Sequence, residues 1–332
     1  MKRKGLILLS GGLDSTLAAS VLMEQGVELE AINFVTCFCT CTKKGCRNEA
    51  LKVSEKLGIK LKIINMTKEY LEIVKNPKHG YGRNINPCID CRIFIFKKAK
   101  DYMKEIGASF IATGEVLGER PMSQRMDAIR LIEKEAGLKG LIVRPLSAKL
   151  LPPSEAETNG IVDRDKLLDI RGRSRKPQIE LAKHFNIKDY PCPAGGCLLT
   201  DSGFAKRSKD LMERNEFTIE NIHLLKVGRH FRLNSDAKLM VGRNESENER
   251  LLSLAREGDL ILDAKDAPGP IGILRGKMGD NGVLKKSAGI VVRYSDNGGE
   301  EMQISYWKHP DGEKQEVTVP SATEVFLDET RI

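Results

Sequence analysis

The sequence contains no apolar run of membrane-spanning length, no internal repeat and no low-complexity tract. A membrane span needs roughly 18 consecutive apolar residues, and no run here approaches that length. The absence of repeats and of biased tracts excludes repeat, fibrous and disordered chains. A chain of 332 residues with 40% hydrophobic and 30% charged residues is therefore expected to be globular and to have two domains.

The N-terminus carries basic residues, but the apolar run after Gly5 is only as long as a strand, so we expect no signal peptide and a cytoplasmic location. The net charge of +8 and the isoelectric point near 9.0 favour a polyanionic partner such as RNA. In such a location cysteines indicate metal or sulfur chemistry and not structural disulfides. The eight cysteines form three clusters: Cys37, Cys39, Cys41 and Cys46; Cys88 and Cys91; Cys192 and Cys197.

Residues 6–16, LILLSGGLDST, combine a buried strand with a glycine-containing turn into a helix. Gly11 and Gly12 let the backbone approach a ligand closely, and the hydroxyls and free N–H groups around them donate to phosphate oxygens. An ordinary strand-to-helix turn, capped by Asp14 or Ser15, is the alternative interpretation. No GK[ST] follows at the spacing of a Walker A loop, so the turn is not of that type.

The string SGGLDST resembles the pyrophosphate loop of the PP-loop, or N-type, ATP pyrophosphatases. Members of this family cleave ATP between its α and β phosphates and adenylate a carbonyl oxygen. The resemblance implies that the loop binds ATP, with Mg²⁺ at the leaving pyrophosphate, and that Asp14 is catalytic. The implied phosphate-binding residues are Ser10, Gly11, Gly12, Asp14, Ser15 and Thr16.

Strand-like and helix-like segments alternate through the first part of the chain. Strands are expected at 6–9, 30–35, 60–64, 110–113 and 141–143, and helices at 16–25, 49–57 and 94–106. This alternation predicts an α/β fold with a mostly parallel sheet covered on both faces, as in the PP-loop (HUP-like) architecture. Because ligands gather at the carboxyl ends of such strands, we expect Ser10, Cys37 and Gly114 at one crevice.

Cys88 and Cys91 form a CIDC motif at the start of a helix. A lone CxxC fits a redox pair, half a zinc site or two ligands of an iron–sulfur cluster. The segment NPCIDCRIFIF, with GGCLLTD downstream, resembles tRNA 2-thiouridine synthetases of the MnmA type. In the iron–sulfur branch of this superfamily three cysteines hold a [4Fe-4S] cluster. The resemblance implies Cys88, Cys91 and Cys197 as ligands and catalytic residues, with Cys192 as the alternative third ligand.

Other interpretations of the cysteines stay open. Cys88, Cys91, Cys192 and Cys197 also fit a structural zinc site, and two of them fit a persulfide mechanism in which one carries sulfur and another resolves it as a disulfide. The first cluster, CFCTCTKKGC, places Cys37, Cys39 and Cys41 on one side of a strand end, with Cys46 folding back. Four such thiolates fit Zn²⁺ or a second cluster, and reduced thiols without a special role are the alternative.

A second loop, IATGEVLGERPMSQ at 111–124, resembles the TGxxLGxxxSQ signature of the 4-thiouridine synthetase (ThiI-type) family, in which this loop borders the nucleotide. The matching residues are Gly114, Leu117, Gly118, Ser123 and Gln124, with one extra residue between Gly118 and Ser123. Gly114, Ser123 and Gln124 are thereby implied to bind the nucleotide. The chain lacks the THUMP-type and rhodanese domains of members that relay persulfide, and we therefore expect the cluster route to sulfur.

Beyond about Glu216 the chain changes to short β-rich segments. Strands are expected at 229–233, 239–241, 260–263, 271–274, 289–294, 302–307 and 316–319, and a helix at 245–256. Residues 238–274, with their VGRN and DLILDAKDAPG strings, resemble the NFACT-R domain, an RNA-binding module. The expected organisation is a thiolation domain at 1–215 and a smaller α+β, RNA-binding domain at 216–332. Candidate RNA contacts are Arg229, Arg232, Arg243 and Lys265.

Together these resemblances imply an ATP-dependent tRNA sulfurtransferase. Such an enzyme adenylates a uracil carbonyl and inserts sulfur from a sulfide or persulfide donor, which gives 4-thiouridine or 2-thiouridine. One alternative is a PP-loop amidation or ligation enzyme with structural zinc, and another is a non-catalytic tRNA- or ribosome-binding factor. The motifs do not distinguish the C2 from the C4 carbonyl.

Overall fold

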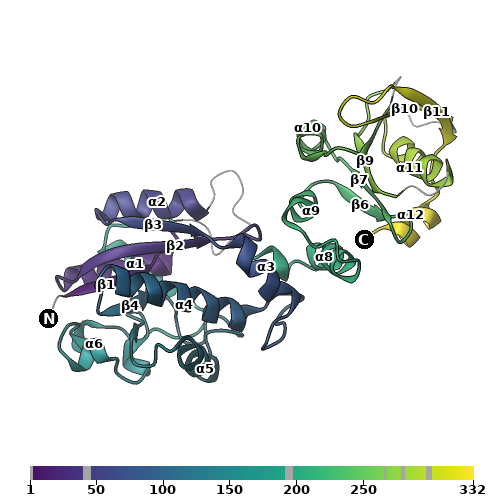
Figure 1. Cartoon of the computed structure of the whole chain (residues 1–332). Coiled ribbons are helices and arrows are strands. Elements are labelled where there is room, and N and C mark those ends of the chain that lie inside the picture. Colours follow the sequence, from purple (N-terminus) through teal and green to yellow (C-terminus); the bar gives the residue numbers. More distant parts are fainter. Residues whose placement is uncertain (1–2, 40–45, 191–196, 265–266, 278–280, 297–300) are drawn as a thin grey trace. The chain divides into compact units, whose positions relative to one another are not determined.

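The computed structural model describes residues 3–39, 46–190, 197–264, 267–277, 281–296 and 301–332, with only the backbone at 46 and 47. The chain divides into two units, residues 1–200 and 201–332 (Figure 1). None of the described helices is long and apolar enough to cross a membrane.

The first unit is a five-stranded sheet between two layers of helices. The strand order is β3-β2-β1-β4-β5, and all neighbouring strands are parallel, which confirms the predicted α/β fold. The strands are β1 (Lys4–Leu8), β2 (Glu28–Val35), β3 (Leu61–Asn65), β4 (Phe110–Thr113) and β5 (Ile142–Val143). The helices are α1 (Leu13–Glu24), α2 (Cys46–Leu57), α3 (Thr67–Lys75), α4 (Cys88–Glu105), α5 (Met126–Ala136), α6 (Glu155–Thr158) and α7 (Lys176–His184).

Alternate residues along β1 face the two helical layers. Ile7 packs in a cluster with residues of α1 and α7, whereas Leu6 and Leu8 pack with residues of α4 and α5. A strand covered on both faces has no exposed side, which explains the continuous apolar run in the sequence. From β1 the chain runs outward through β2 and β3 and then returns to β4 on the other side of β1. Such a reversal of strand order places a ligand crevice at the carboxyl ends of β1 and β4.

The second unit is an antiparallel sheet of six strands in the order β11-β10-β8-β9-β7-β6. The strands are β6 (Arg229–Arg232), β7 (Ala237–Val241), β8 (Leu260–Ala264), β9 (Gly272–Gly276), β10 (Glu301–Lys308) and β11 (Gln315–Pro320). The helices are α8 (Ser202–Glu213), α9 (Ile219–Leu224), α10 (Glu245–Leu254), α11 (Asn281–Arg293) and α12 (Glu324–Thr330). Leu239 and Val241 pack with α11, whereas Met240 packs on the opposite face with residues of α9 and α10. The expected smaller α+β domain is confirmed.

The predicted strand at 289–294 is wrong, because residues 289–293 form the second half of α11. The run from Ser287 to Val292 is buried throughout, so its apolar pattern shows no helical period. Gly289 also allows the end of β11 to approach the helix, since a Cβ there would lie 2.9 Å from the carbonyl oxygen of Pro320. Close packing of this kind has no local signal in the sequence.

The structure places the division between the units at Thr200, and the expected boundary at residues 215 and 216 lies just beyond α8. Helix α8 belongs to the second unit because its side chains form ion pairs with strands of the second sheet. Asp210 of α8 forms ion pairs with Arg232 of β6 at 2.5 Å and with Lys238 of β7 at 3.7 Å.

Candidate active site

The phosphate loop (residues 10–16) connects β1 to α1 and is held by its own hydroxyl groups. The Oγ of Ser10 accepts the Gly12 N–H at 3.2 Å and lies 3.1 Å from the Oγ of Ser15. Ser15 and Thr16 both donate to the Gly12 carbonyl, at 2.9 and 3.0 Å. These hydroxyls fix the turn, and the N–H groups at the start of α1 remain the natural donors to an anion.

Glycine is required at two places around this loop. Gly11 has φ +79°, and a Cβ there would lie 2.6 Å from the backbone nitrogen of Ala50 in α2. At Gly114, after β4, a Cβ would lie 2.4 Å from the carbonyl carbon of Asp14. The second loop therefore lies in backbone contact with the phosphate loop, as the strand order predicts.

Asp14 lies in a group of buried polar atoms that lack partners. Burial raises the pKa of its carboxyl group, and the nearby Arg175, Gln178 and Arg120 oppose that shift. Among the residues that the structure describes, no group hydrogen-bonds to Asp14 Oδ1 or to Arg175 Nε. Buried polar atoms are normally satisfied, so unpaired atoms at a glycine-rich loop fit a polar ligand such as a polyphosphate with its cation.

The second loop is closed by hydrogen bonds of its own. Gly118 N–H donates to the Gln124 carbonyl at 2.7 Å, and Arg120 N–H donates to Gln124 Oε1 at 3.0 Å. Ser123 and Gln124, implied to bind the nucleotide, are 5% and 3% exposed. In this structure Gln124 shapes the loop that borders Asp14.

A buried carboxylate joins this loop to the helix that carries the CIDC motif. Glu115 pairs with Arg144 at 3.0 Å and with Arg92 of α4 at 3.3 Å. Arg144 also forms an ion pair with Glu133 of α5 at 2.5 Å. Glu115 and Arg144 are almost fully buried, so the pairs fix α4 relative to the second loop.

Four cysteine thiols from separate segments converge beside the first sheet, and we call Cys39, Cys88, Cys91 and Cys197 the thiol group. Cys88 and Cys91 occupy the first turn of α4. Cys39 and Cys197 face each other across an antiparallel bridge, and Leu198 N–H donates to the Phe38 carbonyl at 2.9 Å. That hydrogen bond makes Cys39 and Cys197 a non-hydrogen-bonded pair, in which side chains approach most closely. The charges of Cys39, Cys88 and Cys91 all act on Cys197.

The four cysteines of the thiol group are partly buried. Burial raises the pKa of Cys88 and Cys91, and that of Cys197 to about 12, so without metal these groups are protonated at neutral pH. The buried Tyr70, whose ring packs edge-on against Phe38 at 5.9 Å, lies beside Cys91. Burial, followed by these cysteines, raises the pKa of Tyr70 well above its usual value.

The described donors of the thiol group are all cysteine sulfurs. Thiolates are the usual protein ligands of iron–sulfur clusters. Within the described residues, no three His, Cys, Asp or Glu side chains lie close enough to hold a single metal ion. A cluster binds each cysteine through a different iron, so its ligands stand further apart. Cys192, Cys41 and the Cys46 side chain lie outside the described residues, and Cys37 is buried with its N–H donating to Thr67 Oγ1 at 3.0 Å.

Arg120 connects the two candidate sites electrostatically. Its charge opposes the upward shift in the pKa of Asp14 at the phosphate loop and also that of Cys88 in the thiol group. Glu119 beside it has a raised pKa, because of burial and then of Asp14. Arg120 therefore lies within electrostatic reach of both the phosphate loop and the thiol group.

Several residues near the phosphate loop and the thiol group have no role in the sequence prediction. Arg175 appears in the sequence only as part of a basic stretch, and Gln178, Tyr70 and Glu115 carry no motif. In the structure, residues 171–172 pair with Leu117 of the second loop, which brings α7 next to Asp14. Only the tertiary fold brings these residues together.

The prediction that Arg232 of the second unit contacts RNA is wrong. Its side chain is 8% exposed and is paired with Asp210 and Glu216. Arg243 is 49% exposed, and Arg229 stacks over Tyr294 at 4.3 Å. Lys265 lies outside the described residues.

Comparisons with known proteins assign both units. The tRNA-specific 2-thiouridylase MnmA of Pseudomonas fluorescens is 35% identical over 138 residues, which are 39% of this chain and 37% of that protein. MnmA of Stutzerimonas stutzeri is 28% identical over 242 residues, 69% of this chain and 60% of that protein. The chain thus spans between about a third and three fifths of the length of these curated relatives.

A crystal structure of a 4-thiouridine synthetase–RNA complex with bound ATP is 23% identical, with a TM-score of 0.39, over 65% of this chain and 53% of that chain. Residues 228–329 match the family described as NFACT protein RNA binding domain. Residues 1–149 match the family described as Thiamine biosynthesis protein (ThiI). The match to the ThiI family thus lies in the first unit, and the match to the NFACT RNA-binding family lies in the second.

Proposed function

We propose that this protein is an AMP-forming tRNA sulfurtransferase that makes 4-thiouridine or 2-thiouridine. The observation that carries the proposal is that the second loop contacts both sites: a Cβ at Gly114 would lie 2.4 Å from the carbonyl carbon of Asp14, and Glu115 pairs at 3.3 Å with Arg92 of α4, the helix that begins with Cys88. A base activated by ATP must receive sulfur before water reaches it, so the two chemistries have to share one crevice. The MnmA relatives and the RNA-binding domain support tRNA as the substrate.

The phosphate loop supplies the activation step. N–H groups at the start of α1 would bind the β and γ phosphates, and Asp14 would hold Mg²⁺, whose charge would neutralise the leaving pyrophosphate. A uracil carbonyl oxygen then attacks the α-phosphate, so pyrophosphate leaves and the base carries AMP. Arg175, whose buried Nε lacks a partner among the described residues, and Gln178, beside Asp14, would hold the phosphates and the cation. The target base must be unpaired or flipped out to reach this loop.

The thiol group supplies the second step. Cys88, Cys91 and Cys197 would hold a [4Fe-4S] cluster, which would supply the sulfide that replaces AMP at the activated carbon. Cys192 is the alternative third ligand, and Cys39 is a further thiol beside Cys197. The partial burial of these residues would limit the access of water, which would otherwise hydrolyse the adenylated base. Zn²⁺ at Cys37, Cys39, Cys41 and Cys46 remains a separate proposal for the first cluster.

The test is anaerobic incubation of reconstituted protein with unmodified tRNA, ATP, Mg²⁺ and sulfide, followed by mass spectrometry of the nucleosides. We expect a thiolated uridine, and its retention against 2-thio and 4-thio standards identifies the carbonyl. Asp14→Asn should lose AMP formation, whereas Cys88→Ser should form AMP without thiouridine. Asp127→Asn, which removes an exposed carboxylate, is the control. ATP consumption in iron-loaded protein without any thiolated product would contradict the proposal.

A further inference from the structure

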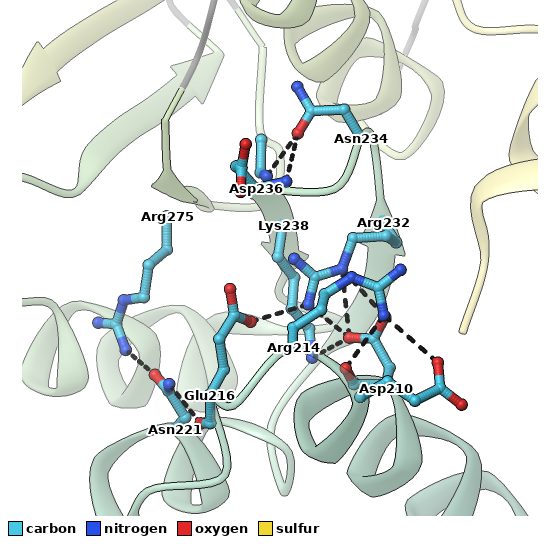
Figure 2. A network of polar contacts seen from close by, with 11 residues as sticks. Asp210, Arg214, Glu216, Asn221, Arg232, Asn234, Asp236, Lys238 and Arg275 are labelled. Atoms are coloured by element: carbon cyan, nitrogen blue, oxygen red, sulfur yellow. Dashed lines mark hydrogen bonds and ion pairs between the residues drawn. The ribbon is translucent and has the colours of Figure 1, made fainter.

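Three cations lie side by side on one face of the second sheet. Arg232 of β6 is in register with Lys238 of β7, and Lys238 is in register with Arg275 of β9 (Figure 2). Residues directly opposite on neighbouring strands share a face, and like charges in such pairs are destabilising. The row therefore needs negative charge from elsewhere.

The two outer cations of the row are neutralised within the protein. Arg232 donates to Asp210 at 3.0 and 2.5 Å and to Glu216 at 2.9 Å. Arg275 donates to Asp259 at 2.8 and 2.5 Å, and its remaining Nη1 donates to the Asn221 amide oxygen at 2.9 Å. All three nitrogens of the Arg275 guanidinium are thus engaged.

Lys238, at the centre of the row, has no comparable partner. Its side chain is 7% exposed, and its nearest carboxylate oxygen, on Asp210, is 3.7 Å away. Within the described part of the chain, no group hydrogen-bonds to Nζ. Burial lowers the pKa of this amine to about 7, although Asp210 opposes the shift. A buried ammonium with three unused donors is costly unless something else accepts them.

A cavity of about 70 Å³ adjoins Lys238. Its charged lining consists of Lys238, Arg256, Arg275 and one carboxylate, Glu216, so cations predominate. Leu224 and Met240 form part of an apolar wall. Water in this space would accept hydrogen bonds from Nζ but would not neutralise the charge, whereas an oxyanion does both.

We propose that this cavity is a binding site for a phosphate-type oxyanion, either free or as a phosphate of RNA, with the Lys238 ammonium as its main donor. Arg256, whose side chain is 55% exposed at the cavity, adds a second donor from the solvent side. The positive charges of Arg232 and Arg275 attract the anion, although both guanidinium groups form their hydrogen bonds within the protein. The site lies wholly within the second unit, so it is separate from the phosphate loop.

The chain contains one tryptophan, which makes the site measurable in the full-length protein. Trp307 packs against the apolar cluster that contains Leu224 and Met240, so its fluorescence follows changes in the second unit, and equilibrium dialysis measures binding directly. We would titrate inorganic phosphate without ATP or tRNA, and measure phosphate retention by equilibrium dialysis in parallel. Failure of the thiolation reaction would leave this result unaffected.

We expect saturable phosphate binding in the wild-type protein and in Lys285→Met, which removes an exposed lysine. Binding should weaken at least about 10-fold in Lys238→Met and about 3-fold in Arg256→Gln, since a charged hydrogen bond is lost from a buried and from an exposed position, respectively. Because the Arg256 guanidinium is exposed, that variant should fold normally. Equal phosphate retention by wild type and Lys238→Met in dialysis, or no saturable binding by either method, would overturn the proposal.

Competition by short RNAs identifies the source of the anion. If 5′-phosphorylated RNA displaces phosphate and its 5′-hydroxyl counterpart does not, the site takes an RNA end. If both displace it equally well in wild type but not in Lys238→Met, the site takes backbone phosphates. If neither competes while phosphate binds, the ligand is a free oxyanion.

Discussion

The two candidate anion sites of this chain are built in opposite ways. The phosphate loop uses backbone N–H groups, glycines and hydroxyls from one continuous segment, and its charged neighbours lie around it. The cavity beside Lys238 uses side-chain cations that meet only because β6, β7 and β9 pair in register. Apart from Asp14, the first design should tolerate changes of charge and fail when its backbone is displaced, and the second should behave in the opposite way.

The largest effect is expected from a single methyl group at the first site. In Gly114→Ala the new Cβ would lie 2.4 Å from the Asp14 carbonyl carbon and 2.5 Å from the Ser15 nitrogen. These backbone atoms cannot move without displacing the phosphate loop, so AMP formation should fall about 100-fold or more. The measurement is ATP-to-AMP turnover with tRNA present.

The matched control is Gly26→Ala, which also changes a glycine near α1. Gly26 has φ +73°, and a Cβ there meets no atom within 4 Å, so it adds backbone strain without overlap. We expect a stability cost of about 1 kcal/mol and unchanged turnover. Equal turnover in the two variants would show that the contact between the loops does not matter.

At the second site the largest effect should come from removing a charge. Asp210→Asn leaves Arg232 and Lys238 without their shared carboxylate in a buried setting. Removing one partner of a buried ion pair costs about 3–5 kcal/mol. We therefore expect the free energy of unfolding of the second unit, measured in urea, to fall by that amount. Asp127→Asn, which breaks the exposed pair with Arg125, should unfold like the wild type. The same unfolding midpoint for both variants would remove the contrast between buried and exposed charge.

Lys238→Met should have a smaller effect of opposite sign. In phosphate-free buffer at pH 7 it removes a buried ammonium without a hydrogen-bond partner, so we expect a gain of about 1–3 kcal/mol in stability. The pKa of Lys238 is lowered to about 7 in the folded state, against an ordinary value near 10.5. Between these values the unfolded chain binds a proton that the folded chain does not, so wild-type stability rises with pH.

The advantage of Lys238→Met should therefore shrink from pH 7 towards pH 10, by at most about 1.4 kcal/mol per pH unit. Asp210, Arg232, Glu216 and Arg207 act on Lys238, and all of them remain in the variant. Urea unfolding of both proteins at several pH values measures the difference. A difference in the free energy of unfolding between the two proteins that does not change with pH would contradict the lowered pKa of Lys238.

The same contrast explains which features the sequence predicts. The phosphate loop, the second loop and the CIDC motif are contiguous, so their residue order carries the chemistry and the alternating strands place them at one sheet edge. Arg175 and Gln178 reach Asp14 because residues 171–172 pair with Leu117, which is a tertiary contact. Cys39 meets Cys197 in the same way. The register of Lys238 with Arg232 and Arg275 likewise depends on strand order, which alternation alone does not specify.

The smallest expected effect tests the claim that charge is secondary at the phosphate loop. Arg120 is exposed, and its charge acts on both Asp14 and Cys88 from the second loop. Arg120→Gln should lower kcat/KM for AMP formation only about 3- to 5-fold, because an exposed charge is screened by water and salt. Arg125→Gln, whose partner Asp127 is exposed, should leave the rate unchanged. If Arg120→Gln instead abolishes AMP formation, its guanidinium must contact ATP directly, and the phosphate loop would depend on side-chain charge as the Lys238 cavity does.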